Sequence, residues 1–470
     1  MLFDFSYAPG TTQEQMLGFE MAGQIWSSYL TDNVTVNIHV EMSNQLPTNV
    51  IGGALPGIQA KYKFDDFLKD FAKDITSIDD NTANQNIFSH AKGYHIFVKG
   101  SSSDNQLKAI QTINMTRANA KALNIVGSSS YLDGYILMSD LSNSSSRWNY
   151  DISGVPVPSN TLDFLSVAVH EIGHVLGFVS GVDDPGWLNA VVDNMNGTKI
   201  DSKKATYFTT LDMFRYSSAS AVLGMADLSI NGDNKFFSID GGKTTLANFA
   251  TGKATSLGAD GDQASHWKHQ INPVGIMDPF LAPSQRREIS TLDRRAMDVM
   301  GWNVSNLSQL NWQAMYNQAV TKAQTARVAN RDQDVQTMVQ QSEVYEWGTS
   351  GRRWQKGFWQ YILDQQIDPS AIVFQNKPIL TTATTSRLES LWQESWASEW
   401  SNYDNLIEDK TVEGNLNQNN EFATSDIGES QLAYIQDEPR DLLLNSKSDR
   451  DLLLLDDLFN QLENQWFGQN

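Results

Sequence analysis

Two histidines and one glutamate are spaced so that their side chains could bind a metal ion and carry out catalysis with it. His170, Glu171 and His174 form the pattern H-E-x-x-H, and Gly177 follows the second histidine by three residues. Side chains four positions apart lie on one face of an α-helix, so both imidazoles can reach the same ion. Glu171 is displaced around the helix, where its carboxylate can reach a metal-activated water as a general base. The pattern therefore predicts a zinc site.

The segment that carries these residues is expected to form a buried helix. Residues 161–177 are apolar at most positions all around a helix, apart from the two histidines and the glutamate. Burying imidazoles and a carboxylate without partners costs free energy, and a bound metal ion removes that cost.

The third ligand is not fixed by this spacing. A catalytic zinc takes three protein ligands and keeps one position open. An extended form of the motif places a third histidine three residues past the glycine, where this chain has Ser180. The segment SHWKH is favoured instead, because His266 precedes Met277, in GIMDP, by eleven residues. The alternatives are His269, the second histidine of SHWKH, and the acidic residues Asp183, Asp184 and Glu288.

The order of helices and strands predicts how these residues are held. Apolar spacing indicates helices over 13–30 and 105–123, and strands over 34–42 and 134–140, ahead of the helix with the histidines. This succession is typical of an α/β layer with a mixed sheet.

Composition divides the chain. The helix expected over 290–300 ends at Gly301-Trp302, and beyond it Gln, Asn, Trp and acidic residues become frequent. We expect a catalytic domain over 1–303, a helical, Trp-rich accessory region over 304–400, and an acidic, partly disordered tail over 401–470.

Composition also excludes several functions. The 470 residues include no cysteine, which rules out disulfides, cysteine–zinc sites and thiol catalysis. A formal net charge of −21 without Lys/Arg clusters argues against nucleic acid as a partner. No apolar run is long enough to span a membrane, and the N-terminal residues lack the features of a signal peptide.

His170–Gly177 followed by GIMDP resembles the metzincin clan of zinc endopeptidases. The long interval resembles the leishmanolysin-like arrangement, in which an insertion separates Gly177 from the third histidine. The segments TLDMFRYSS, FFSIDGGKT, ASHWKH and STLDRRAMDVMGW are similar to uncharacterised bacterial metzincin-like proteases, cyanobacterial ones among them. This resemblance covers 1–303 and nothing in 304–470. Where some members have a tyrosine after the turn methionine, this chain has Pro279.

The resemblance implies an α+β catalytic domain with a mixed sheet and an active-site helix that ends at Gly177. It implies His266 as the third zinc ligand and Met277 as the methionine of a tight turn beneath the metal. It also implies that the strand 134–140 is the sheet edge along which substrate aligns, although a plain buried strand explains the same residues.

The predicted function is a zinc-dependent metalloendopeptidase that acts on protein or peptide substrates, with Glu171 as general base. The alternative is a zinc-stabilised binding or scaffold protein without protease activity. Resemblance to the clan favours a secreted protein, whereas the missing signal peptide favours a cytoplasmic one.

Overall fold

The computed structural model describes most of residues 1–328, and all of the described residues belong to one compact unit. The unit combines helices with a mixed β-sheet, so the predicted α+β class is confirmed at this level. The tail 401–470 and most of the region 304–400 lie outside the described residues. Within 1–328 the positions that are not described are 44–50, 88, 91–92, 101–102, 130–131, 143, 154, 203–207, 306 and 308.

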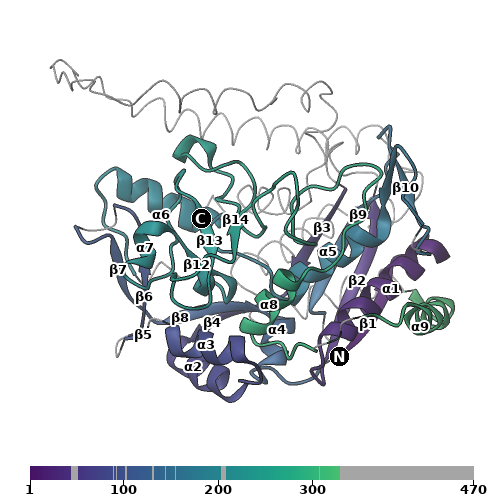
Figure 1. Cartoon of the computed structure of the whole chain (residues 1–470), viewed down its shortest axis with the longest axis horizontal. Coiled ribbons are helices and arrows are strands. Elements are labelled where there is room, and N and C mark those ends of the chain that lie inside the picture. The colour runs from purple at the N-terminus through teal and green to yellow at the C-terminus, as the bar shows by residue number, and fades with distance from the viewer. Residues whose placement is uncertain are drawn as a thin grey trace, which may run out of the picture. The chain divides into compact units, whose positions relative to one another are not determined.

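A five-stranded sheet forms one layer of the unit (Figure 1). Its strands run in parallel except at one edge, where β3 is antiparallel to β9. The order across the sheet is β15 (Arg327–Val328), β1 (Leu2–Tyr7), β2 (Thr35–Ser43), β9 (Gly134–Ser139) and β3 (Gly52–Pro56).

The expectation that strand 134–140 forms the sheet edge is wrong. β9 pairs with β2 on one side and with β3 on the other, so its backbone groups are used in the sheet. The plain buried strand is therefore the correct interpretation of GYILMS. Among the described strands, β3 occupies the edge beside β9.

Two helices cover one face of the sheet. The predicted first helix is present as α1 (Gln13–Tyr29), and a capping box joins Thr12 and Gln15 at its start. The histidines lie on α5 (Phe164–Leu176), which packs against α1, β3 and β9. Phe19 of α1 meets Phe164 of α5 edge to face, with ring centroids 5.6 Å apart. This apolar contact fixes α5 against the sheet through α1.

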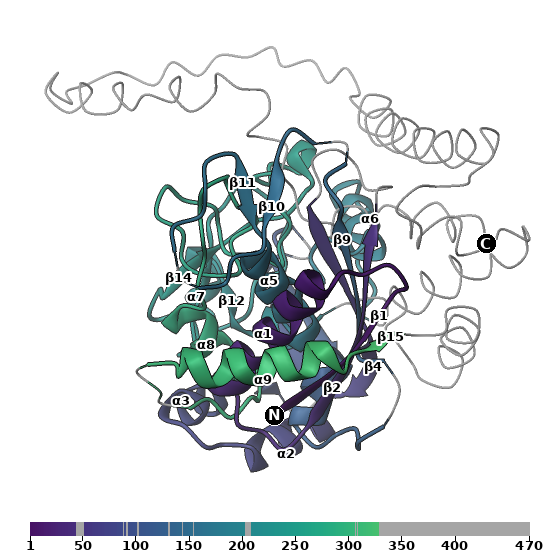
Figure 2. The same ribbon diagram turned by 90° about the vertical axis from the view of Figure 1, so that its right-hand side faces the viewer.

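Residues beyond Trp302 join the same unit. The helix α9 (Trp312–Gln324) packs against α1, as Figure 2 shows, and buries Met315 and Ala319. Lys322 Nζ donates to the carbonyl of Phe3 at 3.3 Å, and β15 extends the sheet beside β1. The unit that begins at Met1 thus continues at least to Val328, past the boundary predicted at residue 303.

The helix predicted over 105–123 is wrong. Two strands occupy most of it, with a left-handed Ala109 (φ 64°) in the first of them, and only the last turn is helical. The second strand pairs with an earlier strand, and this pairing overrides the helical spacing of its apolar residues. The three elements are β7 (Gln106–Ile110), β8 (Thr112–Thr116) and α4 (Arg117–Ala122).

The remaining elements surround this core. Near the lower end in Figure 1 are α2 (Phe64–Lys73) and α3 (Ile78–Asn86). Above them is β4 (Ile58–Lys63), and to its left are β5 (Ser89–His90) and β6 (Gly93–Phe97). The later ones are β10 (Arg147–Asn149), β11 (Thr161–Asp163), α6 (Pro185–Met195), η1 (Leu211–Phe214), β12 (Arg215–Tyr216), α7 (Ser218–Ala221), β13 (Lys235–Phe237), β14 (Ala247–Phe249), η2 (Thr255–Leu257) and α8 (Thr291–Val299).

Candidate metal centre

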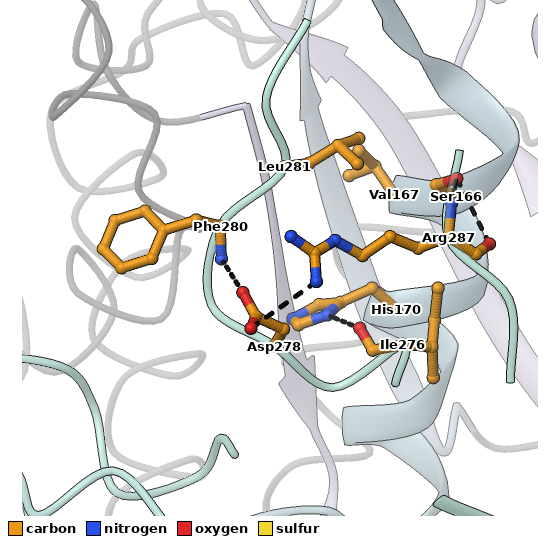
Figure 3. A pocket seen from close by; sticks show the side chains of 8 residues that line it. All are labelled: Ser166, Val167, His170, Ile276, Asp278, Phe280, Leu281 and Arg287. Atoms are coloured by element: carbon orange, nitrogen blue, oxygen red, sulfur yellow. Dashed lines mark hydrogen bonds and ion pairs between the residues drawn. The ribbon is translucent and has the colours of Figure 1, made fainter. Parts of the chain in front are cut away.

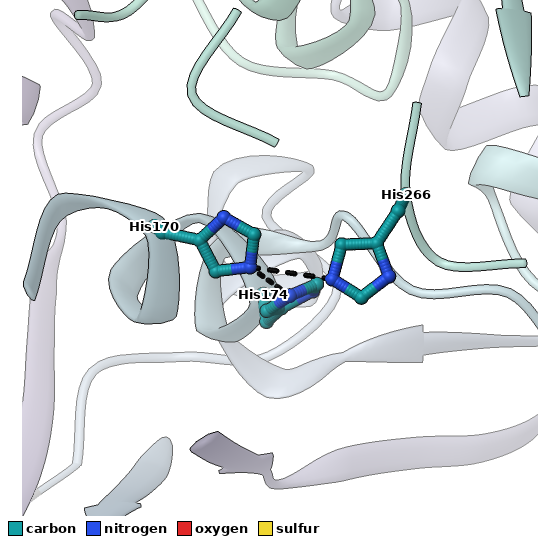
Figure 4. A group of neighbouring side chains, drawn as sticks. All are labelled: His170, His174 and His266. Atoms are coloured by element: carbon teal, nitrogen blue, oxygen red, sulfur yellow. Dashed lines mark hydrogen bonds between the residues drawn. The ribbon is translucent and has the colours of Figure 1, made fainter. Parts of the chain in front are cut away.

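Three imidazoles converge on one point in the interior. His170 and His174 come from α5, and His266 reaches them from the segment that follows β14 (Figure 4). The Nε2 atom of His170 lies 2.9 Å from that of His174 and 3.3 Å from that of His266. All three side chains are buried. Within the described part of the chain, no other group of three or more His, Asp or Glu side chains could hold a metal ion.

The other ring nitrogen of each histidine contacts a backbone carbonyl. His170 Nδ1 lies 2.7 Å from the Ile276 carbonyl oxygen, and His174 Nδ1 lies 2.7 Å from that of Phe178. His266 Nδ1 lies 3.2 Å from the carbonyl of Gln263. A carbonyl only accepts, so Nδ1 must carry the proton in each ring. Each Nε2 therefore presents an unprotonated lone pair to the other two.

This arrangement fits a metal ion. The Nε2 atoms face one another without a proton to form hydrogen bonds between them, so their lone pairs repel. A cation bound among them would be coordinated by these lone pairs. Tetrahedral zinc with bonds of about 2.0–2.1 Å separates its ligand nitrogens by about 3.3–3.4 Å, close to the observed spacing. Burial, aided by the neighbouring histidines, holds the pKa of His170 well below its usual value, and burial does the same for His266. Both rings are therefore neutral, which is the metal-binding form.

Local sequence fixes both ends of α5. Asp163 caps the first turn, where its carboxylate accepts from the backbone N–H of Ser166 at 3.1 Å. Gly177 ends the helix with φ 134°, a conformation that favours glycine. The turn brings the Phe178 carbonyl back to His174, so the glycine of the motif also sets the orientation of that imidazole.

Met277 lies against α5 at Gly173, the residue before His174. A Cβ on Gly173 would stand 2.5 Å from Met277 Sδ and 3.4 Å from Trp26 Cζ2, so only glycine lets both side chains approach. Met277 is fully buried, and the carbonyl of Ile276 beside it orients His170. The sequence GIMDP therefore places one carbonyl against His170 and one thioether against Gly173 of the same helix.

Gly173→Ala is expected to lower the free energy of unfolding by about 1–3 kcal/mol, because the new methyl group overlaps Met277 in a packed interior. The same change in a helix without such a contact stabilises by up to about 1 kcal/mol. Urea unfolding measures the difference. Gly127→Ala, which lies outside any helix and has nothing within 4 Å of its added Cβ, serves as the control without steric overlap. Equal stabilities of the two variants would show that Met277 does not depend on Gly173.

The structure separates the alternative ligands from the cluster. His269 Nδ1 contacts Asp278 Oδ1 at 2.9 Å. The carboxylate of Asp183 accepts from the backbone N–H groups of Lys253 and Ala264, so it anchors the loop that leads to His266. Glu288 is exposed. None of these side chains, nor Asp184, belongs to the described group that could hold a metal.

The side chain of Glu171 extends from α5 to the edge strand β3. This side chain is fully buried, and a Cβ on Gly52 of β3 would stand 3.0 Å from its Oε1. The missing side chain at Gly52 therefore lets the edge strand pass close to this carboxylate.

Two buried aspartates support the site and were missed at the sequence level. Asp293 accepts from the backbone N–H of Ile276 at 2.9 Å and from Trp267 Nε1 at 2.7 Å, so it holds the turn to the segment of His266. Asp212 accepts from Ser180 Oγ at 2.6 Å and from the Gly181 N–H at 2.9 Å. The capping box at the start of α8, in which Asp293 is the third helical residue, was the available signal for the first.

No protein-family model, curated protein or solved structure matches this chain. The helices in the described residues include none that is long and apolar enough to cross a membrane.

Proposed function

We propose that the chain is a zinc-dependent metalloendopeptidase that hydrolyses peptide bonds. The observation that carries this proposal is the set of three buried imidazoles, each with Nδ1 held by a carbonyl and Nε2 turned to a common centre. His170, His174 and His266 would hold the zinc. Three neutral nitrogen ligands leave the fourth position of a tetrahedral ion to water and substrate.

When bound, zinc would supply a Lewis acid that lowers the pKa of a water molecule and polarises the peptide carbonyl. Glu171 would accept the proton of the attacking water and deliver it to the leaving amine. A purely structural site usually closes with a fourth protein ligand and has no use for a buried carboxylate next to it. A buried glutamate directly after the ligand His170 on α5 thus favours catalysis over the scaffold alternative.

The edge strand β3 suggests how a substrate aligns. It is the last described strand on its side of the sheet, and its Gly52 lies against Glu171. An extended peptide that adds to this edge by backbone hydrogen bonds would bring its amide groups past the general base.

Metal removal tests the proposal. Purified protein is expected to contain about one zinc per chain and to digest casein. A chelator such as 1,10-phenanthroline should abolish digestion, and added zinc should restore it. A serine-protease inhibitor should have no effect, which controls for a contaminating protease. Full digestion by protein shown to be free of metal would exclude the proposed chemistry.

A further inference from the structure

A pocket opens beside His170, between α5 and the segment that follows Met277. Val167 and His170 line it from the helix, and Asp278, Phe280, Leu281 and Arg287 line it from the later segment. The pocket is small: its cavity volume is about 10 Å³, enough for one small polar group, and it opens to solvent. Figure 3 shows the guanidinium of Arg287 near the middle of this group, with His170 and Asp278 on one side and Leu281 on the other.

Arg287 is a buried cation with unused hydrogen-bonding capacity. Its side chain is only 9 % exposed. Neither Nε nor Nη1 makes a hydrogen bond. Burial lowers the pKa of the guanidinium from its usual value, because the charged group has lost much of its hydration. A guanidinium has five N–H donors, and leaving them unpaired in the interior costs free energy.

Asp278 compensates this charge only in part. Its Oδ2 lies 3.5 Å from Arg287 Nη1, a long ion pair. The carboxylate also accepts from the backbone N–H of Phe280 at 3.0 Å and contacts His269 Nδ1 at 2.9 Å. Shared among three partners, Asp278 does not satisfy all donors of Arg287, and Arg287 lines the pocket that a second anion would enter.

The backbone keeps Arg287 in this place. Its N–H donates to Ser166 Oγ at 2.8 Å, on the first turn of α5. Ser166 Oγ in turn donates to the capping Asp163 at 2.7 Å. The backbone of Arg287 is thus anchored to the same helix that carries His170, which keeps its side chain beside the pocket that an incoming anion would enter.

We propose that Arg287 is a specificity-determining residue that selects substrates with a carboxylate next to the cleaved bond, an inference that rests on the proposed peptidase function. A carboxylate can pair with two guanidinium N–H groups at once, which gives both direction and free energy. The carboxylate can come from an Asp or Glu side chain, or from the C-terminus of a short peptide. Both sources offer the same chemistry to Arg287.

Matched peptides separate the two sources. The first pair consists of two longer peptides that differ only in having Glu or Gln next to the cleaved bond. One such pair carries this residue before the cleaved bond, and another carries it after the bond. In the second pair, the peptide ends at that residue as a free acid or as an amide. The zinc-loaded protein is expected to hydrolyse one acidic member with kcat/KM about 10- to 100-fold above its neutral partner, as for a charged hydrogen bond. A preference within the first pair assigns the side chain, and within the second the terminus. No preference in either pair overturns the inference.

Variants connect the preference to Arg287. Arg287→Gln should bring the acid-to-neutral ratio close to one, whereas Arg286→Gln, which loses an ion pair with Asp163 outside the pocket, should keep it. A folding defect lowers both rates alike and leaves the ratio unchanged. Calorimetric binding of the same peptides to zinc-loaded Glu171→Gln protein gives a second readout, in which the acidic peptide should bind more tightly.

The outcomes distinguish this inference from the proposed function. If the zinc-loaded protein hydrolyses neither casein nor any peptide, the peptidase proposal fails and the inference fails with it. If it hydrolyses acidic and neutral peptides equally, or if Arg287→Gln retains the preference, only the role of Arg287 is overturned.

Discussion

Glu171→Gln is expected to reduce the rate of peptide hydrolysis by about 10²–10⁴-fold, the usual effect of losing a general base. The amide matches the carboxylate in size but cannot accept a proton from water. Zinc content should not change, because the three histidines and their carbonyl partners do not include this side chain. Steady-state hydrolysis of a quenched fluorescent peptide, with metal analysis of the same preparation, measures both quantities.

Glu20→Gln is the matched control for this experiment. Glu20 is also buried on a helix, and burial raises its pKa to about 7, so near neutral pH a large share of this group is already uncharged, as the amide is. Tyr7 donates to its Oε1 at 3.1 Å, and the amide oxygen can accept that bond. This variant should retain hydrolysis. A Glu171→Gln protein as active as the Glu20→Gln protein would remove the general base from the mechanism and would favour the zinc-stabilised scaffold.

Local parts of the site could be predicted from sequence because their causes are local. The positions of His170 and His174 on one helix face follow from helix geometry, and Gly177 marks the end of that helix. The position of His266 depends instead on how the long segment after Gly177 folds back toward α5. Buried anchors such as Asp183 and Asp212 fix that closure, and nothing in their sequence surroundings distinguishes them from exposed aspartates. The resemblance to a family, more than the spacing of SHWKH from GIMDP, pointed to His266.

The errors in the fold also have physical causes. The segment 105–123 satisfies a helical spacing, yet β8 pairs with β4, and Ala109 takes a left-handed conformation within β7. The edge strand β3 was not predicted because two glycines and a proline give it little intrinsic strand preference. Its pairing with β9 supplies the stabilisation that its sequence lacks. Tertiary pairing decided the structure in both cases.

His266→Ala is expected to weaken zinc binding by well over 100-fold. Mutation of a residue that only hydrogen-bonds to a metal ligand already lowers metal affinity by about 10- to 100-fold, and loss of a ligand itself should cost more. The two remaining imidazoles would leave two positions of a tetrahedral ion to water. Binding to the folded state alone stabilises a protein, so added zinc should raise the melting temperature of the native chain and not that of this variant. Competition with a chromogenic chelator gives the affinity, and thermal unfolding with and without zinc gives the stabilisation.

His269→Ala is the matched control, because it removes the same side chain from the same short segment. His269 contacts Asp278 and stands edge to face with Phe280, away from the three converging rings. This variant should keep its zinc and its response to added zinc. Retention of zinc by His266→Ala together with its loss in His269→Ala would show that SHWKH supplies the other histidine. Retention by both would mean that the ion does not depend on this segment, and that the convergence of His266 with the helix pair serves packing alone.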